Sequence, residues 1–570
     1  MVTNFSEAET LVDLFKFIAK NHKSDFCLNY LNNDHWKHIS TKDFIKKTLA
    51  LAQYLKSIGV TNNSKVAIFA KSSPYWLIYD FAILLNGAIS VPMFTNISPL
   101  NLSFQIKDSG VKFAFVDGSE NWQEIKKYIK NFDEIIVHSI KVKSPKVTYL
   151  SHIIENAENS VSINCFKKQI NTNDIATIIY TSGSTGNPKG VCLTHGNLVS
   201  QVQSSSKLFD LSNTDTALSF LPLAHIFERM VMLLYLTQNV KVYFADDVLN
   251  VQKLLAEVKP TVITTVPRLL EKIFFGVKEK IASASFVKRS IAKIAFKYAL
   301  KASTDWSNKN FIWSLSNKIL YKKIIDNLGG NIKIMITGGA PLTADIYKFF
   351  INIGLPLYQG YGLTETSPVI SVNYPNAVKF GSSGKVLPSV KVKINTDGEI
   401  LVKGPNVMHS YYKNIKETEN AIKDDWLYTG DLGRIDSDGY LFINGRKKEL
   451  MKTSNGKYVS PVNIEAMLKN IDHVENAMIV ADGYKFVSAI IFPNKAGLKS
   501  NKIKLKKFYK YVSDEIDQIN KNLNNWEQVK KFIIAKDNPS ISNNQLTPSM
   551  KIRRHIILDH YKKSILALYK

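Results

Sequence analysis

The chain has 570 residues, which is too many for one hydrophobic core because single cores stop growing at roughly 250–300 residues, so two or more domains are expected. A composition of 45% hydrophobic and 21% charged residues, without a long polar repeat, indicates a globular protein and argues against disorder. Lys and Arg exceed Asp and Glu by 74 to 48, and the net charge of +26 would attract nucleic acid, anionic lipid headgroups or phosphorylated substrates.

The cysteines and the apolar segments favour a cytoplasmic protein. Three scattered cysteines lack the C-x-x-C spacing of a metal or redox site and fit a reducing compartment. The N-terminal residues lack the basic region and apolar core of a secretion signal. The most apolar stretch, residues 75–94, is interrupted by Asp80, Asn86 and Pro92, so it could not satisfy its polar groups in hydrocarbon. We therefore expect no transmembrane segment.

Alternating strand and helix patterns begin at residue 65. They follow one another in the order typical of βαβ units. Strands are expected at residues 66–70, 88–94, 111–116, 240–244, 261–265 and 332–336, and helices at residues 75–85 and 251–258. The sequence thus predicts a multi-layer α/β body built on parallel sheets.

A basic helical segment follows at residues 274–328. Within it, Val287, Ile291, Ile294 and Tyr298 share one helical face. A basic amphipathic helix of this kind can lie on a membrane surface, but the same pattern more often marks a helix packed on its own domain. We expect the packed arrangement and keep the membrane as the alternative.

The pattern changes again after Gly381. Short strands with turn signals at residues 390–394, 400–402 and 437–443 predict a β-rich subdomain that ends the large body. The remainder mixes strands at residues 477–480 and 487–492 with charged helices, which is typical of a smaller α+β domain. We place the large domain at residues 1–435 and the small domain at residues 436–570.

Residues 177–191 read TIIYTSGSTGNPKGV, an apolar strand that leads into a loop of glycines and hydroxyls. Such a loop suits phosphate, because glycines let backbone N–H groups approach an anion and Lys189 adds a positive charge. Pro188 precedes this lysine and Gly190 follows it, so the Walker A spacing of motor-type NTPases is absent. Alone, the loop could equally be a flexible linker.

Five further segments decide between these readings, because they recur in the order found in one superfamily. They are LPLAHIFE at 221–228, TGGAP at 337–341, YQGYGLTET at 358–366, YTGDLG at 428–433 and GRKKELMK at 445–452. With the loop at 180–191, the chain resembles the adenylate-forming superfamily of acyl-CoA synthetases, luciferases and peptide-synthetase adenylation domains over most of its length. The resemblance implies an ATP-consuming ligase that joins a carboxylic acid to AMP.

The same resemblance implies the residues that bind ATP and AMP. They are Tyr180, Thr181, Ser182, Gly183, Ser184, Thr185, Gly186 and Lys189 of the loop, followed by Gly339, Ala340, Pro341, Gln359, Gly360, Tyr361, Thr364, Asp431 and Arg446. The implied roles agree with the chemistry of these side chains. Tyr361 offers an aromatic face to adenine and Thr364 a hydroxyl to the α-phosphate, while Glu365 and Thr181 offer oxygen ligands to Mg²⁺.

The remaining nucleotide contacts concern the base and the ribose. Residues 339–341 are small and follow an apolar strand, so they leave room for a flat base. Asp431 would accept hydrogen bonds from both ribose hydroxyls, and Arg446 would contact the ribose or a phosphate. Taken alone, Asp431 could simply cap a turn.

Adenylation places a carboxylate oxygen in line with the α-phosphorus and needs positive charge on the phosphoryl oxygens as pyrophosphate leaves. The residues implied as catalytic are Lys551, Lys189, Thr364 and Glu365. Lys551 lies in LTPSMKIRR, which is similar to the long-chain branch's lysine segment. Met550 stands where many relatives have glycine, so this assignment rests on the Thr-Pro-x-x-Lys pattern.

A second half-reaction follows in the family, in which a thiol, usually that of coenzyme A, attacks the acyl-adenylate after the small domain rotates. Asp436 matches the hinge of this mobile domain, and Gly456 lies in the loop that replaces the catalytic lysine. His225 matches a position that borders the acyl pocket. A lone histidine in an apolar stretch is otherwise most often a core residue.

Residues 327–342, residues 445–461 and the helical insert resemble long-chain fatty acyl-CoA synthetases in particular. This branch implies a fatty acid, ATP and coenzyme A as substrates, and Mg²⁺ as cofactor. A fatty acyl-AMP or acyl-carrier-protein ligase is the rival, although the inserted block that would favour it is missing from residues 428–452. From another class, a non-catalytic binder of adenylate or lipid is disfavoured by the retained charged residues.

The partners follow from the charge and the implied substrate. A fatty acid partitions into bilayers, so the positive charge could hold the enzyme peripherally on the inner face of an anionic membrane. The lysines are dispersed among many Asn and Ile, so biased genome composition explains the charge equally well. Zinc spacing and RNA-binding aromatic signatures are missing, so no nucleic acid is expected. A homodimer stays open.

Overall fold

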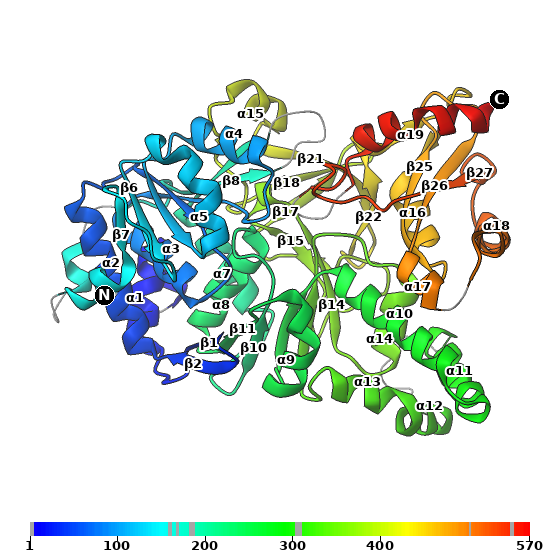
Figure 1. The fold of residues 1–570 in the computed structure, drawn as a ribbon, viewed down its shortest axis with the longest axis horizontal. Helices are drawn as coiled ribbons and strands as arrows, with labels where there is room; N and C mark the ends of the chain where they lie inside the picture. The colour runs from blue at the N-terminus through cyan, green and yellow to red at the C-terminus, as the bar shows by residue number, and fades with distance from the viewer. Residues whose placement is uncertain are drawn as a thin grey trace.

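The computed structural model describes residues 5–157, 162–166, 170–181, 188–301, 310–500, 503–547 and 552–570. Figure 1 shows a large body of helices and sheets at the left and centre, and a smaller group of C-terminal elements at the right. The fold class predicted from the sequence is confirmed: a large α/β domain with parallel sheets and a β-rich part precedes a smaller C-terminal α+β body.

One sheet of eight strands carries the N-terminal βαβ units. Its order is β19 (Ser410–Tyr411), β9 (Lys189–Thr194), β8 (Ile175–Thr181), β4 (Ile89–Pro92), β3 (Lys65–Phe69), β5 (Phe113–Asp117), β6 (Glu134–His138) and β7 (Val147–Tyr149). The strands from β8 to β7 are parallel, whereas β9 pairs antiparallel with β8 and with β19. The phosphate-loop segment therefore joins two strands that lie side by side.

A second sheet of nine strands carries the later motifs. Its order is β16 (Lys385–Val386), β15 (Val369–Val372), β14 (Leu357–Gly362), β13 (Ile334–Thr337), β12 (Val262–Thr265), β10 (Thr216–Ser219), β11 (Lys241–Phe244), β1 (Leu28–Asn32) and β2 (His35–Ile39). The strands from β14 to β1 are parallel. The carboxyl ends of β13 and β14 thus meet at one edge, where ligands of α/β sheets usually bind.

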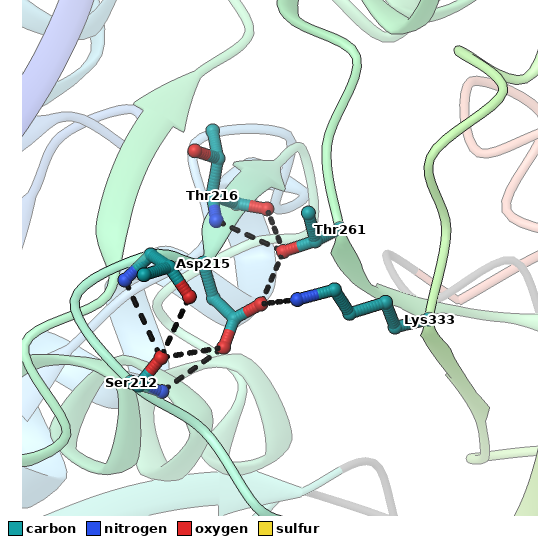
Figure 2. A network of polar contacts seen from close by, with 6 residues as sticks. Ser212, Asp215, Thr216, Thr261 and Lys333 are labelled. Atoms are coloured by element: carbon teal, nitrogen blue, oxygen red, sulfur yellow. Dashed lines mark hydrogen bonds and ion pairs between the residues drawn. The ribbon is translucent and has the colours of Figure 1, made fainter.

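At the amino ends of the parallel strands, a buried carboxylate links three strands of this sheet (Figure 2). Asp215, just before β10, accepts hydrogen bonds from Ser212 N at 3.0 Å and Thr261 Oγ1 at 2.8 Å, and pairs with Lys333 Nζ at 3.3 Å. Thr261 Oγ1 in turn accepts from Thr216 N at 3.0 Å. This network links the amino ends of β10, β12 and β13.

Helices from the first half of the chain share one hydrophobic core with strands of both sheets. They are α1 (Leu11–Asn21), α2 (Thr41–Ser57), α3 (Pro74–Leu85), α7 (His195–Ser206) and α8 (Ile226–Thr237). Inside it, the Arg229 guanidinium of α8 donates two hydrogen bonds, of 2.7 and 2.8 Å, to the Asp80 carboxylate of α3. Both side chains are almost fully buried. None of the described helices is long and apolar enough to cross a membrane.

The helices of the basic segment and their neighbours in the chain form a layer on the second sheet. They are α9 (Val251–Val258), α10 (Pro267–Ser283), α11 (Phe286–Lys301), α12 (Phe311–Ser316), α13 (Lys322–Asn327) and α14 (Ala344–Asn352). The expectation that residues 286–300 form a helix packed on its own domain is confirmed, but the face that packs is different. Ala295, Phe296 and Ala299 are buried, whereas Val287, Ile291 and Ile294 are exposed.

A five-stranded antiparallel sheet follows as the β-rich subdomain. It contains β17 (Lys391–Ile394), β18 (Glu399–Lys403), β20 (Ile422–Lys423), β21 (Trp426–Ile435) and β22 (Leu441–Arg446). Asp436 lies in the turn between β21 and β22, and β22 pairs with β21 up to Arg446. The residues after Arg446 leave this sheet.

The C-terminal body is built on three strands, β25 (Val474–Val480), β26 (Val487–Pro493) and β27 (Val529–Ile534). One sheet face packs on α16 (Pro461–Lys469) and α18 (Leu505–Asn520), and the other on α19 (Arg554–Tyr569). Ion pairs join this body to α10, with Lys278 Nζ at 2.5 Å from Asp472 and Arg268 at 3.5 Å from Glu475.

Candidate active site

The strands that carry Tyr361 and Arg446, β14 and β22, lie near the middle of the molecule (Figure 1). The YGLTE segment bends sharply there. A Cβ on Gly362 would lie 1.8 Å from the Pro368 carbonyl oxygen, so only glycine fits this turn. The buried Thr366 side chain closes the turn, since its hydroxyl bonds the backbone of Leu363 and Pro368. The turn places Tyr361 on β14 and Glu365 on the short 3-10 helix Thr364–Thr366.

Tyr361, Asp431 and Arg446 form one hydrogen-bonded cluster. The Tyr361 hydroxyl donates to Asp431 Oδ2 at 2.7 Å, and Arg446 Nε donates to Asp431 Oδ1 at 2.7 Å. Asp431 is 4% exposed, whereas the Arg446 side chain is 44% exposed and reaches solvent. Burial and the Asp431 carboxylate raise the pKa of Tyr361 well above its usual range, so this hydroxyl remains a donor. Three predicted residues from three strands thus meet.

Glu365 and Lys189 belong to a second cluster that the sequence did not reveal in full. The Tyr411 hydroxyl of β19 donates to Glu365 Oε1 at 2.9 Å, and Lys189 Nζ lies 5.1 Å from the centre of the Tyr411 ring. Lys189 forms an ion pair with Glu417 of α15 (Ile415–Ala421), which lowers the pKa of that carboxyl. Lys189, Tyr411 and Glu365 therefore lie beside the strand ends that carry the phosphate-loop segment.

The two clusters are electrostatic neighbours. Burial, followed by the Glu365 carboxylate, raises the pKa of Tyr411, and the charge of Arg446 opposes that rise. Arg446 therefore acts on Glu365 and Tyr411 as well as on Asp431. The site presents three carboxylates, a guanidinium and an ammonium group within one region, which suits a ligand with hydroxyls and with negative charges.

Other predicted nucleotide contacts occupy different surroundings. Tyr180 is 5% exposed, packs in the core of the first sheet, and donates from its hydroxyl to Asp108 at 2.6 Å. Thr181 ends β8, and its hydroxyl lies 3.5 Å from the Lys189 carbonyl oxygen. Gln359 and Gly360 lie on β14, two residues and one residue before Tyr361, respectively.

Gly339, Ala340 and Pro341 follow β13 and are exposed at the carboxyl edge of the second sheet. Gly339 has a φ of +82°, and a Cβ there would meet no atom within 4 Å. Open space beside this backbone agrees with a site for a flat base. Their part in nucleotide binding stays a prediction.

His225, Asp436 and Gly456 stand apart from the two clusters. The His225 ring caps α8, accepting a hydrogen bond from Phe227 N at 3.3 Å, and lies 6.5 Å from the Phe94 ring. Lys379 Nζ pairs with Asp436 at 2.7 Å and lowers the pKa of its carboxyl. Gly456, with a φ of +77°, lies in an exposed turn between β23 (Met451–Lys452) and β24 (Tyr458–Val459).

Several predicted residues lie outside the part of the chain that the structure describes. They are Ser182, Gly183, Ser184, Thr185, Gly186 and Lys551. Thr364 is described and begins the 3-10 helix beside Glu365. Thr181 and Lys189, which pair across β8 and β9, are described on either side of residues 182–187.

Sequence reasoning missed Tyr411, Glu417 and Glu228. The first two come from a short strand and a short helix without a motif of their own, and only the pairing of β19 with β9 brings them to Lys189. Glu228 stands next to Arg229 on α8 and is 1% exposed. Its carboxylate accepts one hydrogen bond from a serine hydroxyl and one from a threonine hydroxyl. Burial raises the pKa of Glu228 to about 7.

Comparison with known proteins gives the chain a family context. A family model described as AMP-binding enzyme matches residues 15–412, and one described as AMP-binding enzyme C-terminal domain matches residues 448–570. The long-chain-fatty-acid–CoA ligase FadD15 of Mycobacterium bovis is 31% identical, over 94% of this chain and 92% of the relative.

Two solved structures show the same fold. The anthranilate CoA ligase AuaEII in complex with anthranoyl-AMP superposes with a TM-score of 0.77 at 19% identity, over 99% of this chain and 100% of that one. The O-succinylbenzoate coenzyme A synthetase MenE of Bacillus subtilis, in complex with ATP and magnesium ion, superposes with a TM-score of 0.69 at 22% identity. That match covers 95% of this chain and 98% of the other.

Proposed function

This chain belongs to the AMP-binding enzyme family, and we propose that it is an AMP-forming long-chain fatty acid–CoA ligase. The observation that carries the proposal is the hydrogen-bonded cluster of Tyr361, Asp431 and Arg446 beside Glu365 and Lys189. The relative FadD15 supports the choice of acid and acceptor, because its name gives that reaction and it matches nearly the whole chain.

In the first half-reaction, ATP binds across the two clusters. The Tyr361 ring faces adenine, Asp431 accepts from the ribose hydroxyls, and Arg446 turns toward the ribose or a phosphate. A carboxylate oxygen of the fatty acid attacks the α-phosphorus, a new O–P bond forms, and the bond to pyrophosphate breaks. Lys189 and Thr364 stabilise the negative charge of the phosphoryl oxygens during this displacement, joined by Lys551.

The residues present fit a magnesium ion. Mg²⁺ usually keeps several waters and binds one or two carboxylates together with substrate phosphates. Glu365 supplies one carboxylate next to the phosphate-loop strands, and the Tyr411 hydroxyl at 2.9 Å fixes its orientation. We propose that Glu365 and Thr181 hold Mg²⁺, which would neutralise charge on the phosphates of bound ATP.

In the second half-reaction, the thiol of coenzyme A attacks the acyl carbonyl carbon, a thioester forms and AMP leaves. We propose that the small domain rotates between the steps, with its boundary at residue 436 and Asp436 at the hinge. The Lys379 pair at 2.7 Å then holds that turn in the present orientation. Gly456 lies in the exposed turn that would approach the site after rotation.

The acyl chain and the location of the enzyme complete the proposal. We propose that His225, which caps α8 with its ring 6.5 Å from that of Phe94, borders the acyl pocket. A fatty acid resides in bilayers, so we propose peripheral association with an anionic membrane surface, driven by the charge of +26. A homodimer remains a prediction.

The test is pyrophosphate release from ATP with fatty acids of graded length, with and without coenzyme A. Release with long acids and formation of acyl-CoA are the expected results. If no acid stimulates release, the ligase proposal is wrong. If release occurs but coenzyme A yields no thioester, the acceptor is a carrier protein or the adenylate is the product. Asp431→Asn serves as the site control and should raise the KM for ATP in every arm.

A further inference from the structure

Two helices of the basic segment, α11 and α12, leave an apolar face in solvent. On α11, Phe286, Val287 and Ile294 are 75%, 66% and 66% exposed. On α12, Phe311 and Leu315 are 83% and 51% exposed. Figure 1 shows both helices at the lower right of the molecule, at the outer end of the helix layer. Single exposed apolar side chains are common on protein surfaces, but a contiguous group of them marks an interaction site.

The exposed face is not needed to attach α11 to the protein. Ala295, Phe296 and Ala299 on the other side of the helix are buried against the layer below. Hydrogen bonds hold the same side, from the Tyr321 hydroxyl to Ala295 O at 2.7 Å and from Asn352 Nδ2 to Ala299 O at 2.7 Å. The helix is therefore anchored by one face and presents a second apolar face outward.

The apolar face continues from one helix to the next. Residues 287, 291, 294 and 298 recur at intervals of three and four, so they form one stripe along α11. Tyr298, at the end of this stripe, donates from its hydroxyl to the Asn310 side chain at 2.8 Å, and Asn310 caps α12. Ile312 and Leu315 are exposed one turn apart on α12. We call the exposed residues of α11 and α12 the α11–α12 surface.

Basic residues predominate in the segment that carries this surface. Residues 280–325 contain ten Lys or Arg residues and a single acidic residue, Asp305. On α11, Lys288 lies on one side of the stripe, and Lys293 and Lys297 lie on the other. Lysine side chains can keep their ammonium groups in the headgroup layer while their stems cover apolar surface. This arrangement matches a helix lying in the plane of an anionic bilayer.

We propose that the α11–α12 surface docks the enzyme on an anionic lipid bilayer. The proposal deepens the proposed function, on which it rests, by naming the surface that would hold a fatty acid ligase where its acid resides. A second copy of the chain is disfavoured as the occupant, because a two-fold contact would bring the same basic rim against itself. A protein partner would have to supply acidic residues around an apolar ridge.

The experiment compares four triple variants with the unaltered full-length protein by co-sedimentation with vesicles. The apolar variant is Val287→Ser, Ile294→Ser, Leu315→Ser, and its control is Leu100→Ser, Val248→Ser, Leu249→Ser. The charge variant is Lys288→Gln, Lys293→Gln, Lys297→Gln, and its control is Lys37→Gln, Lys42→Gln, Lys56→Gln. All twelve side chains are exposed, so the fold should not change.

Vesicles of phosphatidylcholine with phosphatidylglycerol, at a ratio of about 7:3, are compared with pure phosphatidylcholine at low and high salt. We expect the unaltered protein to bind the anionic vesicles and not the neutral ones. The charge variant should lose roughly 100-fold in partitioning, since each basic residue near such a surface contributes about fivefold. The apolar variant should lose at least about tenfold. Both controls should stay within about twofold.

Three results would overturn the proposal. The first is the absence of binding to anionic vesicles, and the second is an equal loss in a control and its matched variant. The third is a dimer of the unaltered protein that the apolar variant dissociates, which would assign the surface to a second copy. Acyl-CoA formation from a long-chain acid delivered on serum albumin, without vesicles, is measured in parallel. If the unaltered protein forms none, the ligase proposal fails while the vesicle data still decide the docking surface.

Discussion

Replacing Glu228 by Gln should remove a pH dependence from the stability of the large domain. Glu228 is 1% exposed on α8, and its carboxylate accepts hydrogen bonds from Ser219 Oγ at 2.6 Å and Thr264 Oγ1 at 2.9 Å. Burial raises its pKa from 4.5 to about 7. The unfolded chain therefore ionises this group at a lower pH than the folded chain does.

Because the pKa of Glu228 is higher in the folded chain than in the unfolded chain, the free energy of unfolding falls as the pH rises. A group with a raised folded-state pKa stabilises the protein most below pH 4.5, and that stability is lost as the pH rises toward 7 and beyond. Between pH 5 and pH 8, the two pKa values correspond to a loss of about 2.5 kcal/mol. Glu228→Gln keeps the shape and the hydrogen-bonding oxygen but cannot ionise.

Urea unfolding at pH 5 and pH 8, followed by tryptophan fluorescence, measures the difference. The free energy of unfolding should fall by about 2.5 kcal/mol more in the unaltered protein than in Glu228→Gln. Glu419→Gln, at an exposed site of α15, changes the same formal charge and should behave like the unaltered protein. If Glu228→Gln shows the same pH dependence as the unaltered protein, the buried carboxyl does not titrate as its surroundings indicate.

Three other predictions concern the site and the core. Glu417→Gln frees Lys189 from a partly exposed ion pair worth roughly 0.2–1 kcal/mol. The KM for ATP in steady-state kinetics should therefore fall about 1.4- to 5-fold, and a raised KM would contradict this role. Lys551→Ala should abolish pyrophosphate release but spare thioester formation from supplied acyl-AMP, and an equal loss of both would refute its role. Asp80→Asn leaves the buried Arg229 charge unpaired and should cost about 3–5 kcal/mol in urea unfolding, with partial recovery in Asp80→Leu/Arg229→Met, and an unchanged midpoint would contradict the pairing.

The order of strands and helices could be read from the sequence because it depends on local hydrophobic patterns. The predicted strands at residues 66–70, 261–265 and 332–336 appear as β3, β12 and β13, each within two residues of the expected bounds. Their parallel pairing follows from the intervening helices. The antiparallel pairing of β9 with β8 was not predictable in this way, because it depends on a loop rather than on a crossover helix.

The sequence alone does not predict which face of α11 packs on the domain. The helix carries two apolar faces, one with residues 287, 291 and 294 and one with residues 295, 296 and 299. Helical periodicity finds both faces but does not say which of them meets the domain, since that depends on the helices beneath. Hydrogen bonds from Tyr321 and Asn352 to the helix backbone select the second face.

The direction of the Tyr180 side chain also could not be predicted from the motif that contains it. It belongs to the signature loop, yet it lies on β8, where side chains alternate between the two faces of the sheet. Ile178 and Tyr180 point to the same core, and the Tyr180 hydroxyl is bonded to Asp108. Membership of a motif therefore predicts that a residue lies near the ligand, while the strand period decides whether its side chain points toward that region or into the core.

We expect ATP to replace hydrogen bonds and ion pairs that the site residues already make within the protein. Asp431 already accepts from Tyr361 and Arg446, and Lys189 already pairs with Glu417, so these three charged groups, which we assign to ATP, are bonded within the protein. Such internal bonds keep the buried Asp431 carboxylate from being left unpaired, which would be costly. They also mean that the affinity for ATP is the difference between two sets of hydrogen bonds and ion pairs. Residues that hold the first set, Glu417 above all, therefore tune the KM without touching the nucleotide.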